Sequence, residues 1–136
     1  MEADQGDNSV PDVVERIATE IVDSGLKVHK ALGPGLLESC YEHCLAYELE
    51  RRSISVSRQV ALPIVYDGLT LDAGYRIDLL VGDAVIVEVK AVDLLAPIHH
   101  AQLLTYLKLS GHQLGFLMNF NVPLFKNGLK RVVNSS

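Results

Sequence analysis

YRIDLLVGDAVIVEVKAV, residues 75–92, is the stretch that decides the fold. Two runs rich in β-branched residues flank a Gly-Asp pair, a pattern that predicts an antiparallel hairpin. An odd-numbered apolar set runs through both strands, so a buried face requires odd residues to lie opposite odd ones: Ile77, Leu79, Val81, Val85, Val87 and Val89. A three-residue loop, 82–84, with Val81 facing Val85, satisfies this parity, because Gly82 or Asp83 can adopt the positive φ that such a turn needs.

The same register predicts that two carboxylates oppose each other. Asp78 faces Glu88 on the neighbouring strand, and Arg76 faces Lys90. Like charges directly opposed across a strand pair repel, and a divalent cation would relieve that repulsion. The alternative is that these charges lie on a solvated face, because isolated E-x-K tripeptides are common. The nearly continuous apolar run 84–92 is typical of a central strand covered on both faces, which favours a cleft for the charges at its end.

Composition predicts one compact domain. The chain has 136 residues, of which 49% are hydrophobic, enough for a genuine core. Residues 1–10 are expected to form a disordered tail, and residues 11–136 a single domain. The net charge of −5 and the pI near 5.4 argue against nucleic-acid binding by bulk electrostatics. Any basic groove must therefore be local.

The two cysteines, Cys40 and Cys44, have the spacing of one helix face and no second pair elsewhere. This pattern supports neither a disulfide framework nor a zinc finger. We expect reduced thiols that pack in a cytoplasmic protein. No signal peptide, membrane-spanning run or internal repeat is visible, so no membrane association is expected.

Two helices are predicted before the first strand. The first begins at Ser9 or Pro11, carries a wide apolar stripe with a structural His29, and ends at Gly33. The second covers roughly residues 35–52. In it Glu38 either complements the helix dipole or points at the Asp78/Glu88 pair as an additional acidic ligand.

A meander and a further helix and strand pair follow. A long strand over 54–66 is interrupted by Pro63, and an Asp-Gly turn leads to 69–71 and the central hairpin. The second half has a helix over 97–110, a buried strand over 113–121, and a last strand over 129–133. Three residues of the helix share a stripe that either faces solvent or faces the cleft: His99, Gln102 and Tyr106. In the last strand two basic residues either touch a phosphate or solubilise an edge: Lys130 and Arg131.

Six short motifs stand in a fixed order along the chain: Gly35-x-x-Glu38-x-x-Tyr41, Arg58-Gln59-Val60, Tyr75-Arg-Ile-Asp78, Val87-Glu88-Val-Lys90-Ala, Gln102-Leu-Leu-Thr-Tyr106-Leu-Lys and Asn119-Phe120. In this order and spacing they resemble the GxxExxY family, which belongs to the PD-(D/E)XK nuclease superfamily. The resemblance covers about residues 12–133. Ile77 stands where many superfamily members have proline, a departure that removes no ligand.

The resemblance implies an α/β fold of the α+β type with a restriction-endonuclease-like core, in which helices flank a mixed central sheet with an antiparallel meander. It also implies the catalytic residues. The catalytic aspartate matches Asp78, the (D/E)xK pair matches Glu88 and Lys90, and the helical glutamate matches Glu38. The Gln-x-x-x-Tyr of exonuclease-type members matches Gln102 and Tyr106.

The implied cofactor is Mg²⁺ or Mn²⁺, hard cations suited to oxygen ligands. Asp78, Glu88 and the carbonyl of Val89 would bind it, and Glu38 would complete the ligand set directly or through water. Lys90 would position the attacking water and help lower its pKa. The alternative role of Lys90 is only to neutralise the two carboxylates.

Three further residues are candidates for orienting the substrate. Gln102 and Tyr106 would hold the substrate or the lysine, and Arg76 would stabilise charge that develops on phosphate. The implied activity is hydrolysis of phosphodiester bonds in DNA or RNA by a metal-activated water. One alternative is a non-catalytic binding or assembly module that retains the fold, as a homodimer, which the acidic pI and small size favour. Another is hydrolysis of a small nucleotide.

Overall fold

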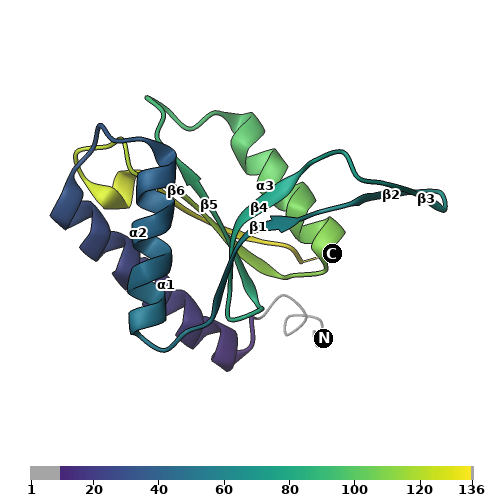
Figure 1. Ribbon diagram of the computed structural model, residues 1–136, viewed down its shortest axis with the longest axis horizontal. Coiled ribbons are helices and arrows are strands. Elements are labelled where there is room, and N and C mark those ends of the chain that lie inside the picture. The colour runs from purple at the N-terminus through teal and green to yellow at the C-terminus, as the bar shows by residue number, and fades with distance from the viewer. Residues whose placement is uncertain (1–9, 136) are drawn as a thin grey trace, which may run out of the picture.

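The computed structural model describes residues 10–135. A five-stranded mixed sheet has the order β1-β4-β5-β6-β7, with α1 and α2 on one face and α3 on the other (Figure 1). The elements are α1 (Asp12–Leu32), α2 (Glu38–Arg51), β1 (Val56–Ala61), β2 (Ile64–Tyr66), β3 (Leu69–Leu71), β4 (Arg76–Val81), β5 (Val85–Lys90), α3 (Pro97–Ser110), β6 (Leu114–Asn119), η2 (Phe125–Asn127) and β7 (Leu129–Val133). The predicted fold class is confirmed. The predicted tail falls outside the described residues except for Val10, which packs against the core.

The hairpin register predicted from odd-numbered residues is confirmed. Val81 pairs with Val85 and Leu79 with Val87, across a loop over residues 82–84. Both Gly82 and Asp83 adopt a positive φ, of 60° and 54°. β5 is the central strand of the sheet and pairs with β4 antiparallel and with β6 in parallel. Its first five residues are all buried, because helices cover both faces of the sheet.

The prediction that Ile77 shares a face of the sheet with Leu79 and Val81 is wrong. Leu79 and Val81 lie in the core beneath α1 and α2, whereas Ile77 lies in the core beneath α3, although all three are odd-numbered. The side-chain alternation breaks at one level of the sheet. There Gln59 of β1 has a φ of +53°, and the pairing of β1 with β4 omits Gln59 and Asp78. A left-handed residue rotates its own strand beyond it, and this break in β1 lies opposite the level of β4 at which Ile77 turns to the α3 face.

The second helix begins later than predicted. It starts at Glu38 rather than at Gly35, whose φ of +102° is incompatible with a helix. The first helix ends at Gly33 as predicted. Glu38 therefore occupies the first turn of α2, and Gly35 shapes the connection that precedes it.

Tyr41 ties this connection to the core. Its hydroxyl donates to the carbonyl of Gly33 at 2.5 Å and accepts from the N–H of Leu36 at 3.1 Å. Its buried ring stacks on Phe120, with ring centroids 4.6 Å apart. The connection and the start of α2 are thereby fixed relative to the sheet.

The predicted long strand over 54–66 is two strands, because the chain leaves the main sheet at Leu62-Pro63. β2 and β3 form a separate hairpin, with the predicted turn at Asp67 and Gly68, that extends away from the five-stranded sheet (Figure 1). Several large apolar side chains of this hairpin are exposed: Val65, Tyr66, Leu69 and Leu71.

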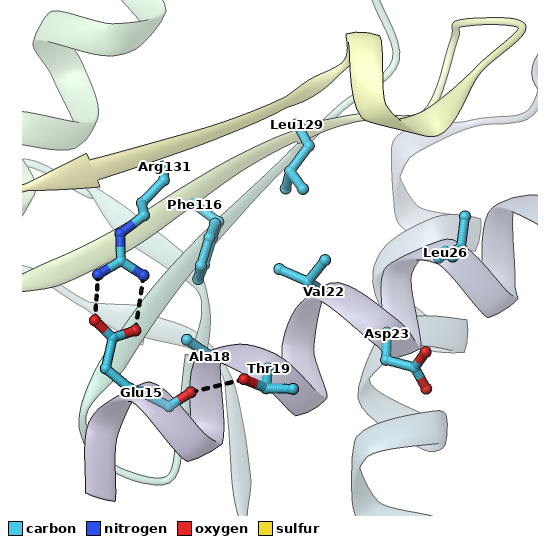
Figure 2. A pocket seen from close by; sticks show the side chains of 9 residues that line it. All are labelled: Glu15, Ala18, Thr19, Val22, Asp23, Leu26, Phe116, Leu129 and Arg131. Carbon is cyan, nitrogen blue, oxygen red and sulfur yellow. Dashed lines mark hydrogen bonds and ion pairs between the residues drawn. The ribbon is translucent and has the colours of Figure 1, made fainter. Parts of the chain in front are cut away.

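The second half of the chain agrees closely with the sequence. α3 covers the predicted residues 97–110 and ends at Gly111 in the left-handed conformation. β6 is buried throughout, and β7 forms an edge of the sheet. Arg131 of β7 donates two hydrogen bonds, of 2.9 and 2.7 Å, to Glu15 of α1 (Figure 2). Within residues 10–135 no helix is long and apolar enough to cross a membrane.

Replacing Tyr41 by phenylalanine is expected to lower the free energy of unfolding by about 1–2 kcal/mol, because the Gly33 carbonyl and the Leu36 N–H lose their partner while the ring stack remains. Urea denaturation measures this change. The matched control is Tyr47→Phe, since Tyr47 is 63% exposed, and it should change the free energy by less than about 0.5 kcal/mol. Equal stabilities for the two variants would contradict the role given to the Tyr41 hydroxyl.

Candidate active site

The hairpin of β4 and β5 opens at the level of Asp78 and Glu88. Backbone pairing ends at Leu79 and Val87, and beyond this point two carboxylates replace carbonyls as acceptors. The N–H of Asp78 donates to Oε2 of Glu88 at 2.8 Å, and the N–H of Val89 donates to Oδ2 of Asp78 at 2.9 Å. The two acidic side chains thus lie side by side between the strands, as the predicted register requires.

Burial makes this pair of carboxylates electrostatically costly. Glu88 is 4% exposed, and burial followed by the charge of Asp78 raises the pKa of Glu88 from 4.5 to about 8. Burial also raises the pKa of Asp78, although the hydrogen bond from the Val89 N–H works against it. The site therefore favours a proton or a cation over two bare negative charges.

Lys90 supplies positive charge to the pair from the last position of β5. Its charge lowers the pKa values of both Asp78 and Glu88. Within residues 10–135 its ammonium forms no ion pair as short as 4.0 Å, so it reaches the carboxylates only at longer range. The Lys90 carbonyl accepts from the N–H of Phe120, which fixes the backbone there.

An acid that the sequence did not single out, Glu42 of α2, lies next to the pair. Glu42 is 6% exposed, and its charge raises the pKa values of both Asp78 and Glu88. Arg58 donates to Glu42 at 2.8 Å, and the Gln59 amide donates to the two Glu42 oxygens at 3.0 and 3.1 Å. The signal that could have found it is its position one helical turn after Glu38, on the same face.

Gln59 links Glu42 to the carboxylate pair. Its amide nitrogen also donates to Oδ1 of Asp78, at 3.4 Å. Gln59 holds a φ of +53°, a conformation that costs free energy in a residue other than glycine. The bonds to Glu42 compensate for that cost and hold the amide beside Asp78.

Glu38 lies at the end of β5, beyond the pair. Its Oε2 accepts from the N–H of Ala91 at 3.2 Å, and its side chain is exposed. Coordination of a metal by Glu38 remains a prediction. Within residues 10–135, no three His, Cys, Asp or Glu side chains lie close enough together to hold a metal ion.

The donor set nevertheless suits Mg²⁺ or Mn²⁺. Asp78 and Glu88 each commit one oxygen to a backbone N–H, and the other oxygens, Oδ1 and Oε1, remain for a cation apart from the long contact from Gln59. Mg²⁺ is commonly bound by one or two carboxylates and several waters. Two acids that repel each other, with oxygens to spare, fit such an ion; a site of three acids is not present among the described residues.

Tyr106 of α3 borders the same site. It is 7% exposed, and burial followed by the charge of Glu88 raises the pKa of its phenol. The charges of Tyr75 and Asp78 contribute less. Gln102, one turn earlier, lines a hollow with Tyr106. The predicted stripe of α3 thus faces the site at Tyr106, whereas His99 accepts from the N–H of Ala96 and caps the helix instead.

Arg76 does not lie in the position that the simple register predicts. The pairing of β4 with β5 has ended before its level. Its guanidinium donates to the carbonyl of Tyr75 at 2.9 Å and lies 3.9 Å from the Asp72 carboxylate. Arg76 is thus directed along its own strand. Among the contacts of the described residues, none joins Arg76 to Lys90.

Other residues noted in the sequence have structural roles. His29 is buried and shares a 2.7 Å hydrogen bond with the carbonyl of Val122, as predicted. Cys40 and Cys44 are free thiols, and burial raises the pKa of Cys44. Arg131 is bound to Glu15, so it serves the fold rather than a phosphate.

A larger hollow, of about 570 Å³, lies between α1 and strands β6 and β7 (Figure 2). Its lining is mostly apolar, with the Glu15–Arg131 ion pair at one side. It lies on the α1 side of the sheet. Its lining includes none of Asp78, Glu88 and Lys90, which together form what we call the carboxylate site. Size alone therefore does not mark the candidate active site.

The comparisons with known proteins agree with this geometry. A family model described as the PD-(D/E)XK nuclease superfamily matches residues 15–132. The matched range includes β1 to β6, β7 as far as Val132, and Asp78, Glu88 and Lys90. Comparison with curated proteins and comparison with solved structures gave no significant match.

In metal-free protein, Glu88→Gln is expected to increase stability at alkaline pH. The folded-state pKa of Glu88, about 8, lies above the unfolded value of 4.5, so the unfolded state releases its proton first as the pH rises. The stability that this residue contributes is present below about pH 4.5 and is lost as the pH rises from there to about 8. Urea denaturation in EDTA should show the variant about 4 kcal/mol more stable than wild type at pH 8, with a smaller difference at pH 5.

The control for this experiment is Glu50→Gln, an exposed position on α2. It should leave the pH dependence of the wild-type protein unchanged. A Glu88→Gln variant whose stability follows pH as the wild type does would show that Glu88 ionises normally in the folded protein.

Proposed function

Because the chain belongs to the PD-(D/E)XK nuclease superfamily, we propose that it is a metal-dependent nuclease that hydrolyses phosphodiester bonds in DNA or RNA. The observation that carries the proposal is the pair of carboxylates, Asp78 and Glu88, held side by side where β4 and β5 separate. A buried and a half-buried acid, both with raised pKa values and each with an oxygen not bound to the backbone, provide a place for a divalent cation. Within the superfamily we assign the chain to the GxxExxY group on its sequence motifs.

The cation proposed is Mg²⁺ or Mn²⁺. Asp78, Glu88 and the carbonyl of Val89 would hold it, and Glu38 would reach it through water from the end of β5. When bound, such an ion supplies Lewis-acid stabilisation of phosphoryl oxygens and lowers the pKa of water. The chain's own residues perform the remaining tasks.

Lys90 is proposed to orient the attacking water and to offset negative charge. Its ammonium, near both carboxylates but bound tightly to neither, is free to donate a hydrogen bond to a water in the site. Glu42 is proposed to act through Gln59, whose amide holds Oδ1 of Asp78. Glu42 is then a positioning residue that fixes the direction in which Asp78 presents Oδ1.

Three residues are proposed to orient the substrate. Tyr106 and Gln102 lie on the α3 side of the site, and a phenol and an amide can orient a phosphate or a water without adding charge. Arg76, which is exposed on β4, is proposed to stabilise charge on the phosphate after exchanging its contact with Asp72 for the substrate. A cytoplasmic location is proposed from the two free thiols.

A second candidate function is a non-catalytic binding or assembly module that retains the fold. The observation that favours it is that several arginines form ion pairs with carboxylates of the same chain. Arg52, Arg58 and Arg131 each bind carboxylates of the same chain, and the net charge is −5. Such a protein has little free positive charge for a phosphate backbone.

The proposal is tested by incubating the protein with labelled single-stranded DNA, duplex DNA and RNA, with Mg²⁺, Mn²⁺ or EDTA. The expected result is cleavage that requires the metal and that falls by at least about 100-fold in Asp78→Asn and Lys90→Ala, because each removes a group of the carboxylate site. The control is Lys30→Ala, an exposed lysine on α1. Circular dichroism verifies that each variant is folded.

Two results would overturn this assignment. One is cleavage that persists unchanged in folded Asp78→Asn, which would point to a contaminating nuclease. The other is the absence of cleavage with every substrate and metal, which would favour the binding module.

A further inference from the structure

A second hollow lies between α3 and the base of the β2–β3 hairpin. Its volume is about 400 Å³, within the roughly 300–1,000 Å³ range of small-molecule sites. It is lined by Ile64, Tyr75, Ile98, Ala101, Gln102, Thr105, Tyr106 and Leu109. Three of these large side chains are exposed at its mouth: Tyr75 at 45%, Ile98 at 68% and Leu109 at 40%.

The lining combines aromatic and apolar surfaces with a few uncharged polar groups. The rings of Tyr75 and Tyr106 meet edge to face, with centroids 6.3 Å apart and planes at 68°. Gln102 contributes an amide and Thr105 a hydroxyl. No lysine, arginine, aspartate or glutamate lines the hollow. A phosphate would find no countercharge there, whereas a flat ring with polar edges would find both stacking surfaces and hydrogen-bond partners.

Two residues of the hollow lead toward the carboxylate site. Tyr106 lines the hollow, and the charges of Glu88 and Asp78 help to raise the pKa of its phenol. Tyr75 immediately precedes β4, the strand that carries Asp78. A group seated in the hollow would therefore be attached within a short distance of a phosphate held at the carboxylates.

We propose that this hollow binds a nucleobase of the substrate strand, with the base against Tyr75 and its polar edge toward Gln102. The inference rests on the proposed function, and it specifies the substrate class as an unpaired strand. A base in a duplex is stacked and paired, so it must leave the helix to enter a side pocket. Stacking of a base on an aromatic side chain adds to the affinity that contacts with the phosphate backbone supply.

The test measures binding in EDTA, so that no hydrolysis occurs. Fluorescence anisotropy is followed with oligothymidylate and oligouridylate of about twelve nucleotides and with an abasic strand of the same length. The wild-type protein should bind both base-containing strands more tightly than the abasic strand. The two base-containing strands distinguish DNA from RNA as the source of the base.

The decisive variant is Tyr75→Ala, with Tyr47→Ala as the matched control. Tyr47 is an exposed tyrosine on α2, on the opposite side of the sheet from α3. Tyr75→Ala should weaken binding of the base-containing strands by roughly tenfold and leave binding of the abasic strand unchanged. Tyr47→Ala should bind all strands as wild type does. Ile98→Glu, a charge placed at the exposed mouth, should reproduce the Tyr75→Ala loss.

Three results would overturn the inference. Equal affinity for abasic and base-containing strands would do so, and so would identical behaviour of Tyr75→Ala and Tyr47→Ala. A dimer in light scattering that Ile98→Glu converts to a monomer would assign the hollow to a second copy of the chain. The failure of the proposed nuclease function can be distinguished from the failure of this inference. Base-dependent binding without cleavage in Mg²⁺ would contradict the nuclease function and support the base pocket.

Discussion

Two negative charges placed between neighbouring strands are the constraint on which this structure depends. Asp78 and Glu88 take over backbone hydrogen bonds at the point where β4 and β5 separate, so their carboxylates are part of the sheet rather than appended to it. Helices on both faces exclude water and raise the pKa values of both acids. The sheet thus holds two acidic groups whose mutual repulsion can be offset by a proton, by the Lys90 ammonium or by a bound cation.

The acids of α2 and the left-handed Gln59 follow from the same constraint. A strand that kept strict alternation through Gln59 would pair Gln59 with Asp78 in the ladder of β1 and β4. Instead, Gln59 at a φ of +53° interrupts the pairing and turns its amide toward both Glu42 and Asp78. Backbone strain of this kind persists where surrounding bonds hold it, and it is often found at functional sites.

The sequence predicted those features that depend on local pattern. Residue parity predicted the hairpin register. A proline at the start of α3 and a glycine after its last residue predicted the two ends of that helix. The sequence did not predict the face of Ile77, because the unpaired level of the sheet at Gln59 and Asp78 leaves no mark in an apolar pattern. Glu42 was missed for a related reason: its partners, Arg58 and Gln59, come from another element, and only the folded chain brings them to it.

The central claim is that Asp78 and Glu88 together hold a divalent cation, and anomalous diffraction from crystals grown with Mn²⁺ tests it most directly. We expect one strong anomalous peak about 2.2 Å from an oxygen of each carboxylate, close to Lys90. A peak elsewhere on the protein, or none between β4 and β5 at saturating Mn²⁺, would contradict it.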